Sequence, residues 1–304
     1  MRKPVKNSLM VAGVVCLLAA AVTAGLLVWR NAFADRAECT VPGLTVGTST
    51  SPPVELTVVQ LHHSATINAV GLSRDVPERG RIIAVATAYQ ESGLRNLDNG
   101  DRDSVGLFQQ RPSQGWGTKD QILDPIYASE KFYDALVQVD NWQKLPLTQA
   151  AQAVQQSAHP DAYAKWEPQA TTLVRSLSGA TPLALNCQAG GHRPTALTPD
   201  RPAPAGTEDA SPQLTSALAA ADAELGGITV QDVSDQGRTA TVGVVVAGQS
   251  PDDAGRTLAA WAVAHATGMN ITDVAVDKQL WTDHDWQSTD QPVDPAVVRI
   301  TVAP

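Results

Sequence analysis

The chain has 304 residues, 43% of them apolar, a composition typical of a globular protein and not of a disordered one. Its formal net charge is −9, and residues 206–304 carry 14 acidic against 4 basic side chains. The acidic surplus therefore belongs to the C-terminal part. Nucleic acid is excluded as a partner, because binding a polyanion needs a basic surface.

The N-terminus has the charge pattern of a membrane anchor. Basic residues within the first six precede an uncharged apolar run over 8–29. A helix of this length spans roughly 33 Å, enough for a hydrocarbon core of about 30 Å. We expect residues 1–34 to be a cytoplasmic stub and a single-pass signal anchor in the cytoplasmic membrane, with the N-terminus inside and the remainder exported. The alternative is a cleaved signal peptide, for which residues 32–34 provide a small-x-small site.

After a tether at residues 35–56, helical patterns predict a mainly α-helical domain over 57–187. Asp75 and Glu78 have capping-box spacing ahead of an expected helix at 81–94. Further helices are expected at residues 124–137, 148–157 and 161–177, the first with Asp124 as its N-cap. Residues 96–118 lack a helical period and predict a long loop or a small irregular β element.

Cys39 and Cys187 bracket this predicted domain in the exported part of the chain. An oxidising compartment favours a disulfide between them, and two free thiols are the alternative. Cys16 falls inside the predicted anchor and is interpreted as a small apolar residue.

Beyond a Pro-rich linker at 188–212, a small α+β domain of unknown role and unknown protein partner is expected over 213–304. Its predicted helices are 214–225 and 251–266, and its strands are 228–233, 239–246, 271–276 and 297–302. His265 falls on the apolar face of its helix and is expected in the core. Trp281 and Trp286 form either an exposed aromatic loop or part of a packed hairpin. The whole chain is thus predicted to be α+β.

Glu91 is the candidate catalytic residue of the helical domain. At about 100° per residue, it shares a helix face with the small residues Ala84, Thr87 and Ala88, whereas bulkier side chains line another side. A carboxylate at the end of such a face, followed by Ser92, could project into an open site. Periodicity alone leaves a solvated surface Glu as the ordinary interpretation.

The neighbourhood of Glu91 resembles a known family. Glu91 and Ser92, followed by Gly106, Leu107, Phe108 and Gln109, resemble the Glu-Ser helix end and the Gly-Leu-Met-Gln turn of the soluble lytic transglycosylases and goose-type lysozymes. The run Gln90–Gly117 resembles a branch found in membrane-anchored cell-wall proteins of actinobacteria. The resemblance covers about Cys39–Cys187 and, more weakly, the C-terminal domain.

This resemblance implies a peptidoglycan lytic transglycosylase that needs no cofactor, with Glu91 as its single catalytic acid and base. Glu91 protonates the glycosidic oxygen of the MurNAc-GlcNAc bond, the substrate's N-acetyl group stabilises the cation, and the C6 hydroxyl closes a 1,6-anhydro product. The expected partners are glycan strands of the wall. Substrate contacts are expected from Ser92, Gln109, Gln110, Gln155, Trp116 and Tyr163.

Two positions depart from the family pattern. Phe108 replaces a Met. The family's Ala-Tyr-Asn-Ala-Gly motif, whose Tyr and Asn contact the catalytic Glu and the sugar, corresponds to Ala153–Ser157, where Gln155 supplies an amide and no Tyr is evident. A catalytically weak glycan-binding or scaffold protein of the same fold therefore stays open.

A hydrolytic muramidase is the other alternative, and it requires a second carboxylate to activate water. Asp101 and Asp103 are the candidates, although acidic turn residues more often pair with a neighbour such as Arg102 or Arg111. The aromatic residues Trp116, Tyr163 and Trp166 either stack on sugar faces or pack in the core.

No metal site is expected. Asp98, Asp101 and Asp103 lack the spacing and the terminal Glu of a calcium loop. His62 and His63 are adjacent and therefore lie on different helix faces. Transport is also excluded, because the chain has one predicted span with no charge inside it.

Overall fold

The computed structural model describes residues 39–46, 49–51, 53–156, 161–179, 183, 185–187, 202–282 and 284–304. The predicted anchor and most of the predicted Pro-rich linker lie outside these residues. Within the described ranges, no helix is both long enough and apolar enough to cross a membrane. Helices and antiparallel strands are both abundant, so the chain is α+β as predicted.

The part before the linker is mainly helical. Its helices are α2 (Val58–Ser73), α3 (Glu78–Ser92), α4 (Lys119–Ile122), α5 (Pro125–Leu136), α6 (Leu147–Gln155) and α7 (Glu167–Ser176), with 3-10 turns η1 (Pro112–Gln114) and η2 (Ala164–Trp166). As predicted, the Asp124 side chain caps α5 by accepting from Ile126 N–H. The predicted helix at 161–177 is shorter than expected, because the chain turns at 161–163 and passes through η2 before α7 begins.

The capping box predicted at Asp75 is absent, which corrects the sequence interpretation. Asp75 has a left-handed φ of 53°, and the N-cap of α3 is Pro77, with no side-chain cap bond. The proline disfavours helical backbone at the residue before it, so the helix starts at Glu78 instead. Its predicted end is nearly correct, since α3 closes at Ser92 with Gly93 in the left-handed conformation.

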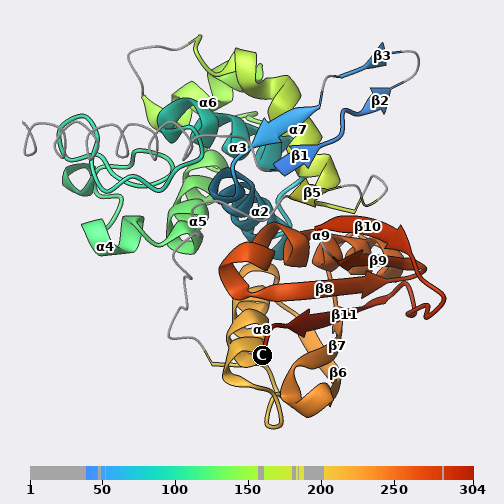
Figure 1. The fold of residues 1–304 in the computed structure, drawn as a ribbon. Coiled ribbons are helices and arrows are strands. Elements are labelled where there is room, and N and C mark those ends of the chain that lie inside the picture. The colour runs from blue at the N-terminus through green and yellow to red at the C-terminus, as the bar shows by residue number, and fades with distance from the viewer. Residues whose placement is uncertain are drawn as a thin grey trace, which may run out of the picture. The chain divides into compact units, whose positions relative to one another are not determined.

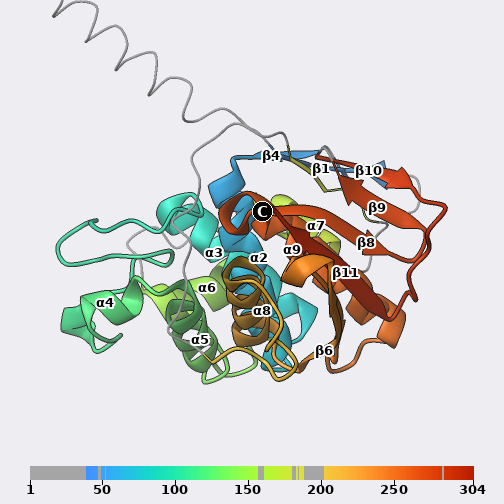
Figure 2. The same cartoon turned by 60° about the horizontal axis from the view of Figure 1, so that its bottom comes forward.

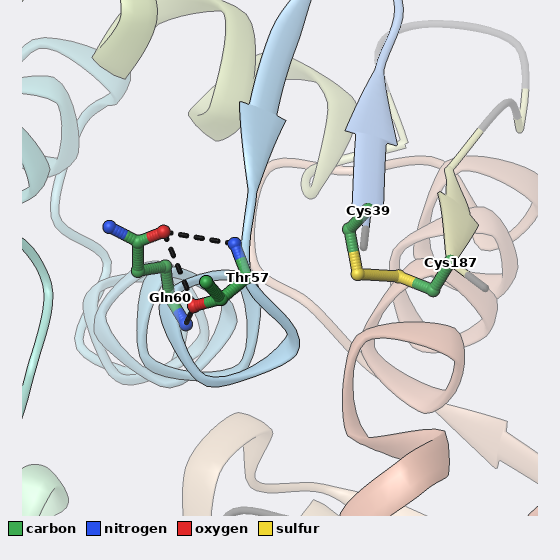
Figure 3. Close-up of a disulfide and its surroundings, with 4 residues drawn as sticks. All are labelled: Cys39, Thr57, Gln60 and Cys187. Carbon is green, nitrogen blue, oxygen red and sulfur yellow. Dashed lines mark hydrogen bonds between the residues drawn. A yellow bond between two sulfur atoms is a disulfide. The ribbon is translucent and has the colours of Figure 1, made fainter. Parts of the chain in front are cut away.

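Helix α2 is buried on nearly every side. It has the capping box that α3 lacks: Gln60 N–H donates to the Thr57 hydroxyl, and Thr57 N–H donates to the Gln60 side chain (Figure 3). Helices α3 and α5 contact it. The sequence does not mark this helix clearly, because a helix enclosed by its neighbours has no polar face and so no amphipathic period.

A small sheet joins the two ends of this helical part. Strand β1 (Cys39–Val41) lies between β4 (Val54–Leu56) and β5 (Asn186–Cys187), and both pairings are antiparallel. Cys39 is in direct register with Cys187, and the two form the disulfide predicted from the sequence (Figure 3). A second, two-stranded sheet pairs β2 (Thr45–Val46) with β3 (Ser49–Thr50).

The C-terminal part contains α8 (Pro212–Leu225), β6 (Ile228–Ser234), η3 (Asp235–Gly237), β7 (Thr239–Val244), α9 (Pro251–Met269), β8 (Ile271–Val276), β9 (Gln279–Thr282), β10 (Asp285–Ser288) and β11 (Val297–Val302). The strands form one antiparallel sheet in the order β10-β9-β8-β11-β7-β6, orange to red in Figure 1. Every predicted helix and strand is present within a few residues. The β9–β10 hairpin was not predicted as strands.

Helices α8 and α9 pack on the sheet and also on α2 (Figures 1 and 2). The sheet contributes apolar side chains such as Val242, Val298 and Ile300, and the helices contribute Leu218 and Leu258, all buried. Residues from Glu38 to Pro304 accordingly form one compact unit. Helix α2 is therefore shared between the core of the helical part and the surface against which the C-terminal part packs.

Candidate functional site

The candidate site is built on the last turn of α3. Most of this helix is buried, including Ile83, Ala84 and Thr87, whereas Glu91 is half-buried. Gly93 N–H donates to the carbonyls of Ala88 and Tyr89, which ends the helix at Ser92, one residue after Glu91. A rigid, buried helix thus presents one partly exposed carboxylate at its end.

Tyr163 holds that carboxylate. Its Oη donates a hydrogen bond of 2.6 Å to Glu91 Oε1, and the Tyr163 side chain is fully buried. The residue lies in the turn before η2, at the position where the predicted continuous helix is broken. The sequence predicts Tyr163 either at a sugar face or in the core. No sequence pattern links it to Glu91, because the contact joins residues 72 positions apart across an irregular turn.

Two residues that were expected to contact substrate, Ser92 and Gln155, instead hold the 106–109 turn in place. Ser92 is buried, and its Oγ lies 2.8 Å from the Leu107 carbonyl and 3.1 Å from that of Ala88. The Gln155 amide on α6 donates to the Phe108 carbonyl at 2.7 Å. The turn that follows the predicted motif is therefore fixed from both α3 and α6, beside the end of the helix that carries Glu91.

The two glutamines after the turn have different roles. Gln109 has a left-handed φ of 49°, and its amide donates to the Gly106 carbonyl at 3.2 Å. Gln110 is buried, and its amide donates to the Ala128 carbonyl at 3.2 Å. Gln110 thus connects the loop to α5 from inside the protein, whereas Gln109 stays at the partly exposed edge of the loop.

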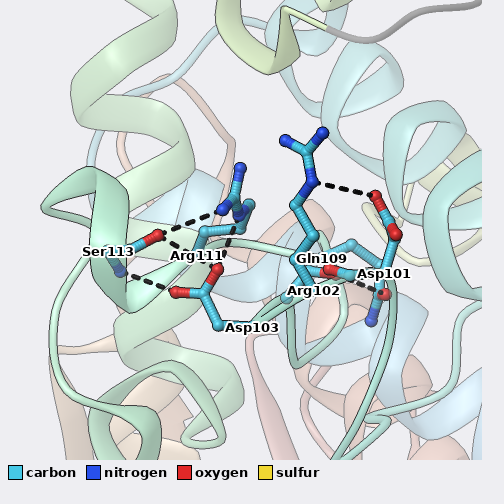
Figure 4. Close-up of polar contacts among 7 residues, drawn as sticks. Asp101, Arg102, Asp103, Gln109, Arg111 and Ser113 are labelled. Atoms are coloured by element: carbon cyan, nitrogen blue, oxygen red, sulfur yellow. Dashed lines mark hydrogen bonds and ion pairs between the residues drawn. The ribbon is translucent and has the colours of Figure 1, made fainter.

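The predicted loop at 96–118 is an ordered structure with isolated bridges at Leu97–Gly106 and Val105–Gln110. Asp103 organises it: its carboxylate accepts from Arg111 Nε at 2.7 Å, Ser113 N at 2.8 Å and Ser113 Oγ at 3.0 Å (Figure 4). The Ser113 backbone and hydroxyl bonds, followed by the Arg111 bond, hold the pKa of Asp103 well below its usual range.

Asp101, by contrast, is almost fully exposed. Its side chain keeps 93% of its accessible surface, and its nearest ionic partner is Arg102 Nε at 3.9 Å (Figure 4). Both aspartates therefore have the neighbours that the turn interpretation expected. Neither has a described contact with Glu91.

Aromatic side chains pack around α3. Trp166 stacks on Tyr89 with ring centroids 4.6 Å apart, and its Nε1 donates to the Gln90 side chain at 3.0 Å. Burial raises the pKa of Tyr89 to about 12, so this phenol stays neutral at physiological pH. Phe108, a position at which the family that the sequence resembles has Met, is fully buried and stacks on Phe132. Trp166 and Phe108 are thus parts of the packing around the site.

The remaining candidates divide between the loop and the C-terminal part. Trp116 is half-buried against the core, and its carbonyl accepts from the Tyr127 hydroxyl at 3.2 Å. His265 is fully buried, as its helix position predicted, and Trp281 is 1% exposed, which favours the packed-hairpin interpretation. Among the residues that the structure describes, no group of His, Cys, Asp and Glu side chains could hold a metal ion.

The geometry combines a carboxylate at a helix end, a buried phenol that donates to it, and a fixed adjoining turn. This arrangement suits general acid and base chemistry with one carboxyl group. Comparison of the chain with protein-family models and with curated proteins found no match.

Proposed function

We propose that the chain is a peptidoglycan lytic transglycosylase in which Glu91 is the single catalytic acid and base. The observation that supports this most directly is the 2.6 Å hydrogen bond from buried Tyr163 to Glu91. The family that the sequence resembles has a Tyr in contact with its catalytic Glu, and this chain provides a phenol from a different position. The signature residues at 106–109 lie on the turn that Ser92 and Gln155 hold.

In the proposed reaction, protonated Glu91 donates its proton to the glycosidic oxygen, and the bond from the anomeric carbon of MurNAc to that oxygen breaks. The N-acetyl oxygen of the substrate stabilises the resulting cation. The C6 hydroxyl then attacks the anomeric carbon and returns its proton to the Glu91 carboxylate. The products are a 1,6-anhydro end and a free GlcNAc end, with no water consumed.

Tyr163 is assigned a positioning role in this scheme. Its phenol donates to Oε1, so the transferable proton of Glu91 is carried on Oε2, the oxygen that Tyr163 does not engage. After transfer, the same hydrogen bond stabilises the carboxylate that accepts the C6 proton. A fixed donor therefore serves both halves of the cycle without moving.

The surroundings of the two loop aspartates favour a reaction that uses one carboxylate over hydrolysis, which uses two. A hydrolytic muramidase needs a second carboxylate as base or nucleophile. Asp103 is occupied by Arg111 and Ser113, and Asp101 is exposed beside Arg102. The sequence pattern further supports a site on the wall side of the cytoplasmic membrane, attached by the predicted span.

The decisive experiment is mass analysis of purified peptidoglycan digested by the full-length chain and by Glu91→Gln. We expect the wild-type chain to release 1,6-anhydro ends, which are lighter by one water than hydrolytic ends, and Glu91→Gln to release essentially none. Ordinary reducing ends would instead establish a muramidase. Equal and negligible release by both proteins, with strand binding intact, would establish a glycan-binding scaffold.

A further inference from the structure

A buried polar cluster lies where the C-terminal part packs on helix α2. His62, Thr66, Glu224 and His265 come from α2, α8 and α9, and each is at most 4% exposed. Thr66 Oγ1 lies 3.0 Å from Glu224 Oε1, and the His62 and His265 ring centroids are 4.2 Å apart. Side chains far apart in the sequence therefore meet in an interior that excludes solvent.

Glu224 links the three helices of this cluster through its carboxylate. Its Oε2 accepts from Trp261 Nε1 at 2.7 Å and lies 3.4 Å from His265 Nε2. The other ring nitrogen of His265, Nδ1, donates to the Trp261 carbonyl at 2.7 Å. The only carboxylate with a described contact in this cluster is therefore already engaged by Thr66, Trp261 and His265.

His63 extends the cluster to the candidate site. Its Nδ1 donates to the Leu94 carbonyl at 2.8 Å, just after the end of the helix that carries Glu91. Gln60 adds a second link, since its amide donates to the Gly93 carbonyl at 3.0 Å. Helix α2 is thus bonded to the end of α3 on one side and packed against α8 and α9 on the other.

The charge balance makes the cluster sensitive to protons. Beyond Glu224 and His265, two ionisable groups on other neighbours have described hydrogen bonds to α2 among the residues that the structure describes, Arg81 of α3 and Tyr133 of α5. They bond to Asn68 and to the Ile67 carbonyl, further along the helix. His62 has an unpartnered Nδ1 in the interior. A proton on His62 or His63 would bury a positive charge on a ring that, among the contacts the structure describes, has no carboxylate partner.

We propose that His62, His63, Glu224 and His265 form a pH-sensitive joint, and that acidification loosens the C-terminal part from α2 and thereby disturbs the end of α3. Its effect on catalysis rests on the proposed role of Glu91, whereas the loosening does not. The C-terminal part, on this proposal, supports the catalytic helix near neutral pH and releases it in acid.

The direction of the effect follows from the histidines. Burial lowers the pKa of His63 from 6.5 to about 4, and burial with the facing His265 lowers that of His62 well below its usual range. A histidine whose pKa is lowered in the closed state binds fewer protons there than in the open state. The closed state is therefore favoured fully above pH 6.5 and progressively less as the pH falls toward 4.

Hydrogen exchange of the full-length chain, normalised to intrinsic rates, tests the joint. Protonation of His63 alone should lower the protection of α2 and α9 amides by roughly 30-fold between about pH 7.5 and about pH 5. Strand β11, whose hydrogen bonds stay inside the C-terminal sheet, is the internal reference and should change much less. Unchanged protection of α2 and α9 in the wild-type chain would overturn the proposal.

Matched variants assign the effect to the histidines. His62→Phe with His63→Gln removes both titrating rings, while the glutamine amide can still donate to the Leu94 carbonyl. This variant should keep its α2 protection in acid. His284→Asn removes a histidine outside the cluster, at a left-handed position that Asn tolerates, and should behave as wild type.

If the double variant loses as much α2 protection in acid as wild type does, the joint is rejected. Should the double variant fail to fold at neutral pH, His62→Phe alone takes its place, since it loses no hydrogen bond at Nδ1. It should lose less α2 protection in acid than wild type, because only His63 still titrates, and an equal loss would reject the joint. Release of anhydro products is followed in parallel. A Glu91→Gln chain with undiminished release would reject the proposed function, while the exchange data would still decide the joint.

Discussion

The phenol of Tyr163 donates to the carboxylate of Glu91 at 2.6 Å, although 72 positions separate the two residues. If this bond orients the catalytic carboxyl, Tyr163→Phe should lower kcat by about 10- to 100-fold and leave KM nearly unchanged, because a hydrogen bond to a charged group contributes about 1.5–3 kcal/mol. Tyr133→Phe is the matched control, since it removes another buried phenol, one that donates to the Ile67 backbone carbonyl and not to Glu91. A loss of activity that merely follows stability in both variants would contradict the positioning role.

That contact also marks the limit of sequence reasoning about the site. Glu91 is a candidate because the motif around it is local, and the Asp124 cap was predicted for the same reason. Tyr163 was not assigned to Glu91, because its position depends on the turn at 161–163 and on where α7 packs against α3. No spacing rule provides that information.

The same contrast holds for the fold. Amphipathic α5 and the strands of the C-terminal sheet have clear periods, and their predicted bounds are close to those observed. Helix α2 has polar residues such as His62 and Asn68 on buried faces, and their partners come from α9 and α3. Such a helix acquires its pattern from tertiary contacts and so cannot be distinguished along the sequence.

The disulfide should contribute strongly to stability. Replacing Cys39 and Cys187 by serine opens a loop closed across 148 positions, and the chain-entropy estimate gives a loss of up to about 5 kcal/mol in the free energy of unfolding. Denaturant unfolding of the full-length chain measures it. Cys16→Ser is the control and should unfold as wild type does. Two alkylatable thiols at positions 39 and 187 in the native chain would contradict this prediction.

The two loop aspartates should respond differently to neutralisation. Asp103→Asn weakens the bonds to Arg111 and Ser113, so it should lower the melting temperature and increase proteolysis within 98–115, whereas Asp101→Asn should do neither. Because the pKa of Asp103 is lowered in the folded state, its carboxylate contributes fully to stability above about pH 3.8. That contribution is lost as the pH falls further. Equal sensitivity of the two variants would refute the assignment.

The predicted anchor makes a topological prediction for the full-length chain. Because basic residues precede the single apolar run, a reporter fused after Pro304 should be exported and should sediment with the membrane. Protease accessibility in spheroplasts and carbonate extraction measure the two properties. A shortened, soluble product that begins at Asp35 would indicate cleavage after residues 32–34 instead.

Gly100 and Gln109 provide a final test, because the loop leaves no room for a side chain between them. A Cβ on Gly100 would lie 1.8 Å from Gln109 Oε1 and 2.6 Å from Ser104 Oγ, so Gly100→Ala must displace the glutamine. If Gln109 binds the glycan, Gln109→Ala should raise KM by about 10-fold, the value of one hydrogen bond of about 1.4 kcal/mol.

Gly100→Ala should then raise KM by a similar factor, and the double variant should be no worse than Gln109→Ala alone, because both changes remove the same contact. Asn99→Ala changes an exposed neighbour and should leave KM unaltered, alone or combined with Gln109→Ala. Steady-state kinetics on soluble glycan strands measures all of these variants. Additive effects of Gly100→Ala and Gln109→Ala would mean that the glycine acts through the loop backbone and not through the glutamine.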